Sequence, residues 1–594
     1  MNSFQMIVKY WLKSKKKFWG AIVLLIISTI FTLVLPRITG TIIGRLTPNE
    51  HGVYQDPMTP TELGVMILFA VLTGFLAFIF NRQARVLNAE VAAKALYFIR
   101  KDIYDAIYSQ SFAYFDKNET GQLVARATSD VDQTEMLFGF ALNLGVQGIM
   151  SLFGVIFMAI QLDISLKGYS IGWIFYIFIP LSLTLSLAVA SRLKPIFLET
   201  RRAFGELTNT LRENIVGAQV VRIFSTQEKE KVKFGKNNVK FRDWSIRSVK
   251  YTSLFFPILM CVVGLMFITL LFFGGNLYFN GILESQQLYT FQGYVGIAIF
   301  PLMMIPNIFI MYYQSDAALT RVREVIESAP DIKDIENPRS ARDMKGDIEF
   351  KNVSFGYTPS TLVLKDISFS VQAGKKIAII GTTGSGKSTI INLLPRFYDV
   401  MAGEILVDGV NVKEYELKEF RKQIGVVSQE TFLFNKPVID NIRFGRDDAT
   451  LDEVIEVAKI ADIHDFIDSL PDKYQAIVGE RGTRLSGGQK QRLSIARALL
   501  IRPKILIFDD STSSVDVETE YRIQKALEMF LDTTTFIITQ RISTIRNADS
   551  ILVLDKGRVV GLGNHDELLN KNPLYTQIYQ TLYHKQSAAK EVPA

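Results

Sequence analysis

The chain has 594 residues, of which 48% are hydrophobic, and its 66 Lys and Arg outnumber its 59 Asp and Glu, which gives a formal charge of +7. A single cysteine excludes an intrachain disulfide. The positive charges cluster beside long apolar runs, as the positive-inside rule requires of membrane proteins, so the basic total does not indicate nucleic-acid binding. Apolar runs crowd residues 18–315 and charged residues fill 330–585, so a membrane half precedes a soluble half.

The membrane half begins with a short amphipathic pattern. Residues 4–17 are typical of a helix lying in the membrane interface, with Phe4, Ile7 and Trp11 on one face. A membrane helix needs about 20 mostly apolar residues. Six runs have this length, at 18–46, 60–82, 136–161, 168–190, 252–279 and 287–314. We therefore predict an α-helical transmembrane domain of six spans over residues 1–329.

The distribution of Lys and Arg predicts the orientation of these spans. The connections at 81–135 and 191–250 are rich in both residues, whereas those at 47–60 and 280–286 contain neither. The basic connections and both termini are therefore expected on the cytoplasmic side of a multi-pass protein of the cell membrane. Residues 83–112 and 195–250 are nearly free of Pro and have few Gly, which predicts long helices that extend beyond the lipid bilayer.

The soluble half begins after a linker. Residues 330–345, which carry Pro330 and Pro338 among mixed charges, are typical of a connecting segment. A strand pattern starts near Asp347, and an α/β domain is predicted over 346–584. The small, polar residues 585–594 predict a disordered tail.

A phosphate-binding loop lies early in this domain. The strand Ile377–Ile380 leads into a glycine-rich segment with the spacing G-x-x-x-x-G-K-S, and a helix follows. Glycines let backbone N–H groups close around phosphate oxygens, and the helix N-terminus adds a positive dipole end. Lys387 reaches the β- and γ-phosphates in such loops, and Ser388 is a ligand of Mg²⁺. The predicted ATP contacts of this segment are Gly381, Thr383, Gly384, Ser385, Gly386, Lys387, Ser388 and Thr389.

Two later motifs identify the kind of ATPase. The strand Lys504–Asp509 ends in a carboxylate, which holds Mg²⁺ in ATPases with a phosphate loop. The sequence Leu485–Gln489 (LSGGQ) precedes a helical run. In this order the motifs resemble the ABC transporter superfamily, specifically the exporter type that fuses six spans to one P-loop ABC ATPase domain.

The resemblance implies roles for further residues and segments. It places Tyr357 against adenine, Gln429 in the loop that contacts ATP and Mg²⁺, Asp516 in the D-loop, and Ser486, Gly487, Gly488 and Gln489 against the ATP of a partner subunit. Residues near 112–133 and 205–224 look like the two cytoplasmic coupling segments of the family. Such segments dock on the ATPase domains, and one of them docks on the domain of the partner, so the dimer is intertwined.

Two residues depart from the family pattern. Asp510 stands where the family has the Glu that positions the attacking water, and Gln540 stands where it has a His that contacts the γ-phosphate. Asp is one methylene shorter, so its carboxylate falls about 1 Å short, a misplacement that costs on the order of a hundredfold in rate. Gln has a similar reach to His and donates a hydrogen bond, but it cannot become cationic. Both positions are candidate catalytic residues of a site that binds MgATP and hydrolyses it slowly.

The resemblance therefore predicts one half of a heterodimeric exporter. A homologous half-transporter would carry the catalytic Glu and His, and the intact signature Ser486–Gln489 would complete its ATP site. The expected cargo is a small hydrophobic or amphipathic compound, as in multidrug export. The alternative is a slow homodimeric exporter of lipid or peptide. Almost no ionisable residue lies at mid-membrane depth, which argues against a channel or a proton-coupled carrier, and the fused ATPase domain disfavours an importer.

Overall fold

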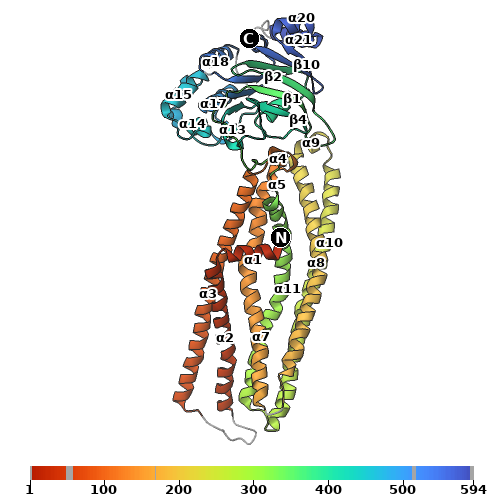
Figure 1. The fold of residues 1–594 in the computed structure, drawn as a ribbon. Coiled ribbons are helices and arrows are strands. Elements are labelled where there is room, and N and C mark those ends of the chain that lie inside the picture. Colours follow the sequence, from red (N-terminus) through yellow and green to blue (C-terminus); the bar gives the residue numbers. More distant parts are fainter. Residues whose placement is uncertain (1–2, 48–57, 167–168, 511–516, 531, 589–594) are drawn as a thin grey trace. The chain divides into compact units, whose positions relative to one another are not determined.

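The computed structural model describes residues 3–47, 58–166, 169–510, 517–530 and 532–588. The chain divides into two compact units (Figure 1). The first unit comprises Met1–Tyr108 and Thr120–Ser328, and the second comprises Ser109–Glu119 and Ala329–Ala594. The segment expected near 112–133 is thus divided, because its first part belongs with the second unit.

The first unit is entirely helical. Its helices are α1 (Ser3–Leu12), α2 (Lys15–Leu46), α3 (Pro60–Tyr108), α5 (Thr120–Ala125), α6 (Val131–Met136), α7 (Leu142–Ser165), α8 (Trp173–Val216), α9 (Ala218–Ile223), α10 (Gln227–Phe279) and α11 (Ser285–Glu327), with π-helical turns η1 (Arg126–Asp130) and η2 (Leu137–Ala141). In the described residues, six continuous helical stretches are long and apolar enough to cross a membrane. They start at Lys15, Pro60, Thr120, Trp173, Gln227 and Ser285. The prediction of six spans is confirmed.

The helices pack as antiparallel pairs. Helices α2 and α3 run side by side, joined by a hydrogen bond from Ser28 Oγ to the carbonyl oxygen of Ala77 (Figure 1). The extensions of α8 and α10 are joined by two ion pairs, Lys240–Glu206 at 2.8 Å and Lys233–Glu213 at 2.9 Å. The helical segment predicted over 195–250 is not one helix, because α8 ends at Val216 and the short helix α9 turns the chain before α10.

The N-terminal helix differs from its predicted form. The pattern over 4–17 forms α1, which ends at Leu12, and α2 then starts at Lys15. The buried residues of α1 are Ser3, Met6, Ile7 and Tyr10, whereas Phe4 is exposed. Tyr10 donates a hydrogen bond of 2.7 Å to Asp102 of α3. The contact with α3 therefore buries Tyr10 in addition to Ile7, which belongs to the predicted apolar face.

The second unit contains two sheets. A four-stranded antiparallel sheet has the order β2-β1-β4-β5, and a six-stranded, mainly parallel sheet has the order β10-β9-β3-β8-β7-β6. Their strands are β1 (Ile348–Phe355), β2 (Leu364–Val371), β3 (Lys376–Gly381), β4 (Ala402–Val407), β5 (Val410–Asn411), β6 (Ile424–Val427), β7 (Ile505–Asp509), β8 (Thr534–Ile538), β9 (Ser550–Asp555) and β10 (Arg558–Gly563). This arrangement confirms the predicted α/β class.

Helices complete the second unit. They are α4 (Phe112–Lys117), α12 (Lys387–Leu393), α13 (Leu417–Lys422), α14 (Val438–Ile442), α15 (Leu451–Ile460), α16 (His464–Asp468), α17 (Gly487–Leu500), α18 (Val517–Phe530), α19 (Ile542–Arg546), α20 (His565–Lys571) and α21 (Pro573–Ala588), with 3₁₀ turns η3 (Arg443–Gly445), η4 (Lys473–Gln475) and η5 (Glu480–Gly482). Because α21 continues to Ala588, the tail predicted to be disordered from residue 585 is helical over its first four residues, and 589–594 lie outside the described residues.

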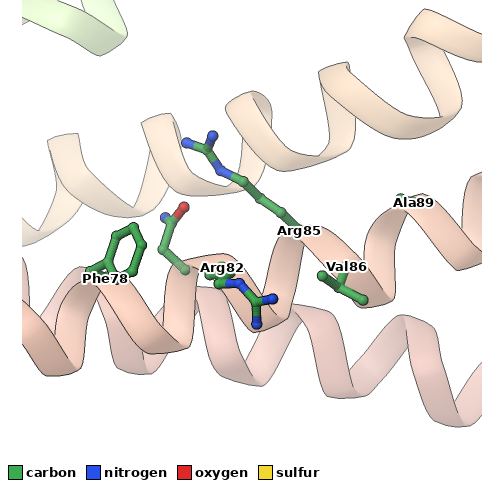
Figure 2. A pocket seen from close by; sticks show the side chains of 6 residues that line it. Phe78, Arg82, Arg85, Val86 and Ala89 are labelled. Atoms are coloured by element: carbon green, nitrogen blue, oxygen red, sulfur yellow. The ribbon is translucent and has the colours of Figure 1, made fainter.

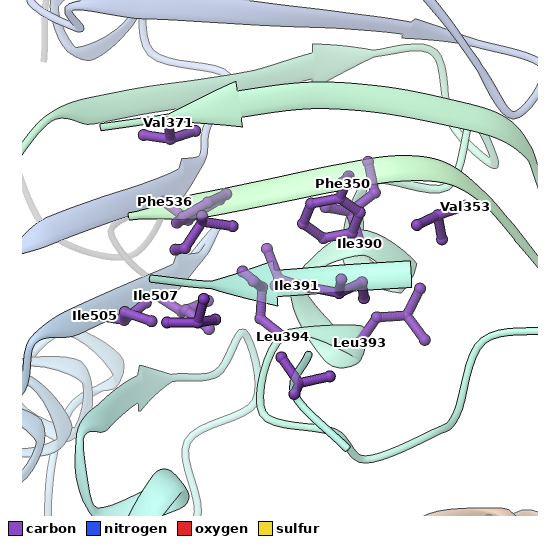
Figure 3. Packing of buried hydrophobic residues seen from close by; sticks show 14 of the residues in the cluster. Phe350, Val353, Val371, Ile390, Ile391, Leu393, Leu394, Ile505, Ile507 and Phe536 are labelled. Carbon is purple, nitrogen blue, oxygen red and sulfur yellow. The ribbon is translucent and has the colours of Figure 1, made fainter. Parts of the chain in front are cut away.

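The core of this unit fixes the helix that follows the phosphate loop. Figure 3 shows Ile390 and Ile391 of α12 packed near Phe350 of β1 and Ile507 of β7. These four side chains are all less than 4% exposed. Because α12 is anchored in the core on this apolar face, the loop at its N-terminus has a fixed position relative to the strands.

Candidate functional site

The phosphate-binding loop joins β3 to α12 and has a backbone that only glycine adopts readily. Gly384 and Gly386 have φ values of 77° and 100°, in the left-handed region. A Cβ atom on Gly381 would lie 2.2 Å from the carbonyl oxygen of Leu554. The glycines of the motif are therefore required for the loop to turn tightly into the helix.

Parallel strands bring the other polar residues to this loop. Ile379 of β3 pairs with Ile538 of β8, and Ile538 in turn pairs with Asp509 of β7. The carboxyl ends of these three neighbouring strands thus lie at one edge of the sheet. Ligands bind in α/β proteins at this edge. Asp509 at the end of β7 is consequently close to the loop, where Ser388 Oγ donates a hydrogen bond of 3.3 Å to Asp509 Oδ1.

The loop offers several groups for phosphate. Lys387 Nζ donates hydrogen bonds of 3.1 and 2.9 Å to the carbonyl oxygens of Gly381 and Thr382. Burial lowers the pKa of the Lys387 ammonium group, an effect that Asp509 and Asp510 oppose. The hydroxyl of Ser385 is buried and has no hydrogen-bond partner among the described residues. An unpaired buried donor costs free energy unless a ligand satisfies it, so the loop fits a phosphate group.

The described residues contain no group of three or more His, Cys, Asp or Glu side chains arranged to hold a metal ion. A Mg²⁺ ion bound with a nucleotide does not need one, since it takes phosphate and water oxygens along with one or two protein ligands. The Ser388–Asp509 pair fits that requirement. Gln429, the third predicted ligand, is exposed just after the end of β6.

Asp510 lies beside Asp509 in a constrained position. Its φ of 44° is unusual for a residue with a side chain, and its backbone N–H donates a hydrogen bond of 2.9 Å to Ile538 at the end of β8. Burial raises the pKa of the Asp510 carboxyl group, and the positive charges of Arg541 and Lys387 oppose this. The pKa of Asp509 is also raised, mainly by burial.

Gln540 follows β8 by two residues and is exposed. The pairing of β7 with β8 therefore brings the two atypical residues, Asp510 and Gln540, to the same edge of the sheet as the phosphate loop. Arg541, the next residue, forms an ion pair with the buried Glu520 of α18. The sequence analysis missed this ion pair, because no motif connects two residues 21 positions apart.

The predicted adenine contact lies in an aromatic cluster. The Tyr357 hydroxyl is 3.3 Å from Thr389 Oγ1 of α12. Its ring, which is 45% exposed, meets Phe355 and Tyr398 edge-on at centroid distances of 5.2 and 5.3 Å. The cluster therefore presents an aromatic surface beside the start of α12 and leaves part of it open for a planar base.

The signature sequence forms the start of a helix. Ser486 is the N-cap of α17, where its hydroxyl accepts a hydrogen bond of 3.3 Å from the N–H of Gln489. In return, the Gln489 side chain accepts one of 2.9 Å from the N–H of Ser486. This capping box holds the N–H groups of Gly487 and Gly488 at an exposed helix terminus, which attracts anions. Asp516, predicted to be in the D-loop, lies outside the described residues.

A segment from between the spans packs within the second unit. The ring of Phe112 in α4 lies 4.1 Å from that of Phe397, measured between centroids. Tyr398 donates a hydrogen bond of 2.7 Å to Asp116 at the other end of α4. Tyr398 therefore contacts both α4 and Tyr357. The sequence analysis missed Phe397 and Tyr398, which follow α12 without a recognisable motif.

Comparisons with known proteins show the family of the chain. A family model for the ABC transporter matches residues 364–513, and one for the ABC transporter transmembrane region matches 18–302. A putative multidrug export ATP-binding/permease protein of Bacillus subtilis is 36% identical over 82% of this chain and 84% of its own. An ATP-dependent lipid A-core flippase of Syntrophus aciditrophicus is 33% identical over 95% of this chain and 93% of its own length. The solved structure of a bacterial Atm1-family ABC exporter with ATP bound covers 98% of this chain and 99% of its own, at 26% identity and a TM-score of 0.82.

Proposed function

Because the chain belongs to the ABC transporter family, as an exporter with its transmembrane region fused to its ATPase domain, we propose that it exports amphipathic or hydrophobic compounds as half of a heterodimer. Both termini and the ATPase domain lie in the cytoplasm in this proposal. The support for the orientation is the concentration of Lys and Arg in the connections at 81–135 and 191–250.

In the proposed site, ATP binds at the edge formed by β3, β8 and β7. Lys387 and the loop from Gly381 to Ser388 hold the phosphates, and Tyr357 stacks on the adenine ring. Ser388 and Asp509, with Gln429, hold Mg²⁺, which neutralises phosphate charge when bound. The hydrogen bond between Ser388 and Asp509 and the unpaired hydroxyl of Ser385 support these assignments.

The observation that carries the proposal of a slow site is the position of Asp510 and Gln540. Both lie at the edge where Lys387, Ser388 and Asp509 are intact, yet neither is the residue that the family uses to aim water and contact the γ-phosphate. The short Asp510 carboxylate stays about 1 Å from a productive position, which lowers the hydrolysis rate on the order of a hundredfold.

A homologous half-transporter would then supply the fast site. Its phosphate loop would receive the exposed helix terminus of Ser486–Gln489 from this chain. Binding of two ATP molecules would favour the closed pair of ATPase domains through their higher affinity for that state, and hydrolysis in the site of the partner would reopen it. Two relatives, one named for multidrug export and one named as a lipid A-core flippase, support an amphipathic cargo.

A hydrolysis assay tests this proposal. The chain is purified alone and together with the half-transporter encoded by the neighbouring gene. We expect slow hydrolysis by the chain alone and fast hydrolysis by the pair. In the chain alone, Asp510→Glu with Gln540→His should raise the rate about a hundredfold. Lys387→Ala in that double variant is the matched control and should remove the gain.

Fast hydrolysis by the unmodified chain alone, lost in Asp510→Asn, would contradict the slow site and favour the homodimer. The export itself is tested separately. Cells that lack this chain and its partner should accumulate a fluorescent amphipathic compound, and the pair expressed from a plasmid should reverse the accumulation. Equal accumulation in both strains would contradict export of that class of compound.

A further inference from the structure

One cation lies deep within the spans. Arg37 precedes Leu46, the last residue of α2, by nine residues, or about 14 Å along the helix axis. The hydrocarbon core of a bilayer is about 30 Å thick. Arg37 is therefore near the middle of the membrane and is one of the few ionisable residues at this depth.

The packing of α2 on α3 gives the same depth. The Ser28–Ala77 hydrogen bond and the Lys17–Glu90 ion pair set the antiparallel register, which places Arg37 level with about residue 70 of α3. Between Glu62 and Arg82, α3 has no charged residue. Figure 2 shows Arg82 and Arg85 on α3, beside the apolar Phe78 and around a surface cavity of about 420 Å³, where arginines are expected at the cytoplasmic boundary of a span.

Arg37 lies next to the closely packed interface between α2 and α11. Residues Leu33, Arg37, Gly40 and Gly44 are spaced by three or four positions, so they share one face of α2. This face meets α11, because a Cβ atom on Gly40 would lie 2.2 Å from Thr290 Oγ1 and one on Gly44 would lie 2.6 Å from Gln286 Cβ. Small residues at this spacing let membrane helices approach closely. This interface therefore fixes the position of the Arg37 backbone.

Polar side chains of α2 and α11 lie within about one turn of Arg37. The buried Tyr294 hydroxyl of α11 donates a hydrogen bond of 3.2 Å to the carbonyl oxygen of Leu33, which lies one turn from Arg37 on α2. One turn further out, Gln286 Nε2 donates a hydrogen bond of 2.9 Å to Thr41 Oγ1. Within the ranges described by the structure, no acidic side chain forms an ion pair with Arg37, whose side chain is exposed.

A charged side chain at this depth is costly, so such residues face the interior of a bundle or a water-filled path and mark the route of a substrate. A guanidinium group is well suited to bind carboxylate and phosphate, since its planar fork donates two parallel hydrogen bonds. We propose that Arg37 binds the anionic head group of an amphipathic cargo, with Thr41 and Gln286 as neighbouring hydrogen-bonding groups. This inference rests on the proposed export of amphipathic compounds and narrows the cargo to anionic amphiphiles.

Three probes that differ only in their head group test the inference. Each carries the same twelve-carbon chain and fluorophore, and ends in a phosphate, a hydroxyl or a trimethylammonium group. The full chain with its partner is reconstituted in phosphatidylcholine vesicles. The measurement is the probe concentration that half-maximally stimulates ATP hydrolysis. For Arg37→Gln we expect this concentration to rise about 10- to 100-fold with the phosphate probe, as loss of a hydrogen bond to a charged group predicts. It should stay within about twofold with the hydroxyl probe.

Two further variants separate recognition from folding. Arg37→Lys keeps the charge without the fork, so its effect should be smaller than that of Arg37→Gln. Arg45→Gln removes a cation two turns away on α2 and should leave all three concentrations unchanged.

Equal shifts with all three probes, or none with the phosphate probe, would overturn the anionic site. If the Arg37→Gln variant lost its partner during purification, the inference would also be overturned. Arg37 would then be assigned to an ion pair with a carboxylate of the partner. Stimulation by the hydroxyl or trimethylammonium probe alone, insensitive to Arg37, would overturn only this inference. Absence of stimulation by every probe, with basal hydrolysis intact, would contradict the proposed export of amphiphiles as well.

Discussion

Replacement of Tyr398 by Phe should reduce coupling between the ATPase domain and the spans. The phenol donates a hydrogen bond of 2.7 Å to the Asp116 carboxylate, the polar contact that joins Tyr398 to α4. Burial and this hydrogen bond raise the pKa of Tyr398, so the hydroxyl keeps its proton and remains a donor. The ring of Phe would retain the edge-on contact with Tyr357, and the stacking of Phe112 on Phe397 would be unchanged.

The expected magnitude follows from the type of bond that is lost. A hydrogen bond to a charged group contributes about 1.5–3 kcal/mol, and the exposure of Asp116 to solvent places this one near the lower limit. About 1.4 kcal/mol corresponds to a tenfold change in an equilibrium constant. The docked position of α4 should therefore become up to about tenfold less populated relative to undocked positions.

The assay compares basal ATP hydrolysis with hydrolysis stimulated by an amphipathic probe, in vesicles that contain the chain and its partner. In Tyr398→Phe the stimulation should fall by up to about tenfold, while the Kd for ATP stays within about twofold. Asp116→Asn should give a similar loss, and the double variant should be no worse than either single one, because all three remove the same bond. Additive losses, or an equal fall in ATP affinity, would refute the role of this hydrogen bond in coupling.

Two other predictions concern the ATPase domain. Burial raises the pKa of Asp509, so this carboxyl group takes up a proton at a higher pH than an ordinary aspartate does, and the gain in ATP affinity from Mg²⁺ should decrease on acidification. A gain that does not change with pH would contradict the assignment of Asp509 as a ligand. Asn441→Ala should lower the free energy of unfolding by about 1–3 kcal/mol, since the buried amide accepts from the N–H of Phe434 and donates to its carbonyl oxygen. The exposed Asn570→Ala is its control in thermal unfolding, and equal stabilities of the two variants would contradict the estimate.

The sequence alone determined the elements that depend on local pattern. Six apolar runs of sufficient length predicted the spans, because a membrane helix must satisfy its own backbone hydrogen bonds over about 30 Å. The spacing of Gly381, Gly386 and Lys387 predicted the phosphate loop, because its turn needs a backbone that glycine provides. The identities of Asp510 and Gln540 were likewise readable, since a motif fixes where they stand in the chain.

Only the tertiary structure decided which distant residues meet. The family resemblance implied that the segment near 112–133 docks on an ATPase domain, but it named no residue of that domain that α4 would meet, since Tyr398 is 282 positions from Asp116. The sequence pattern of α1 did not show that Tyr10 would be buried, because its partner Asp102 lies far along the chain in α3. Arg37 looked like part of an apolar run until the register of α2 against α3 and α11 showed its depth and its polar neighbours. Periodicity describes one helix at a time, whereas these contacts follow from how two helices are aligned against each other.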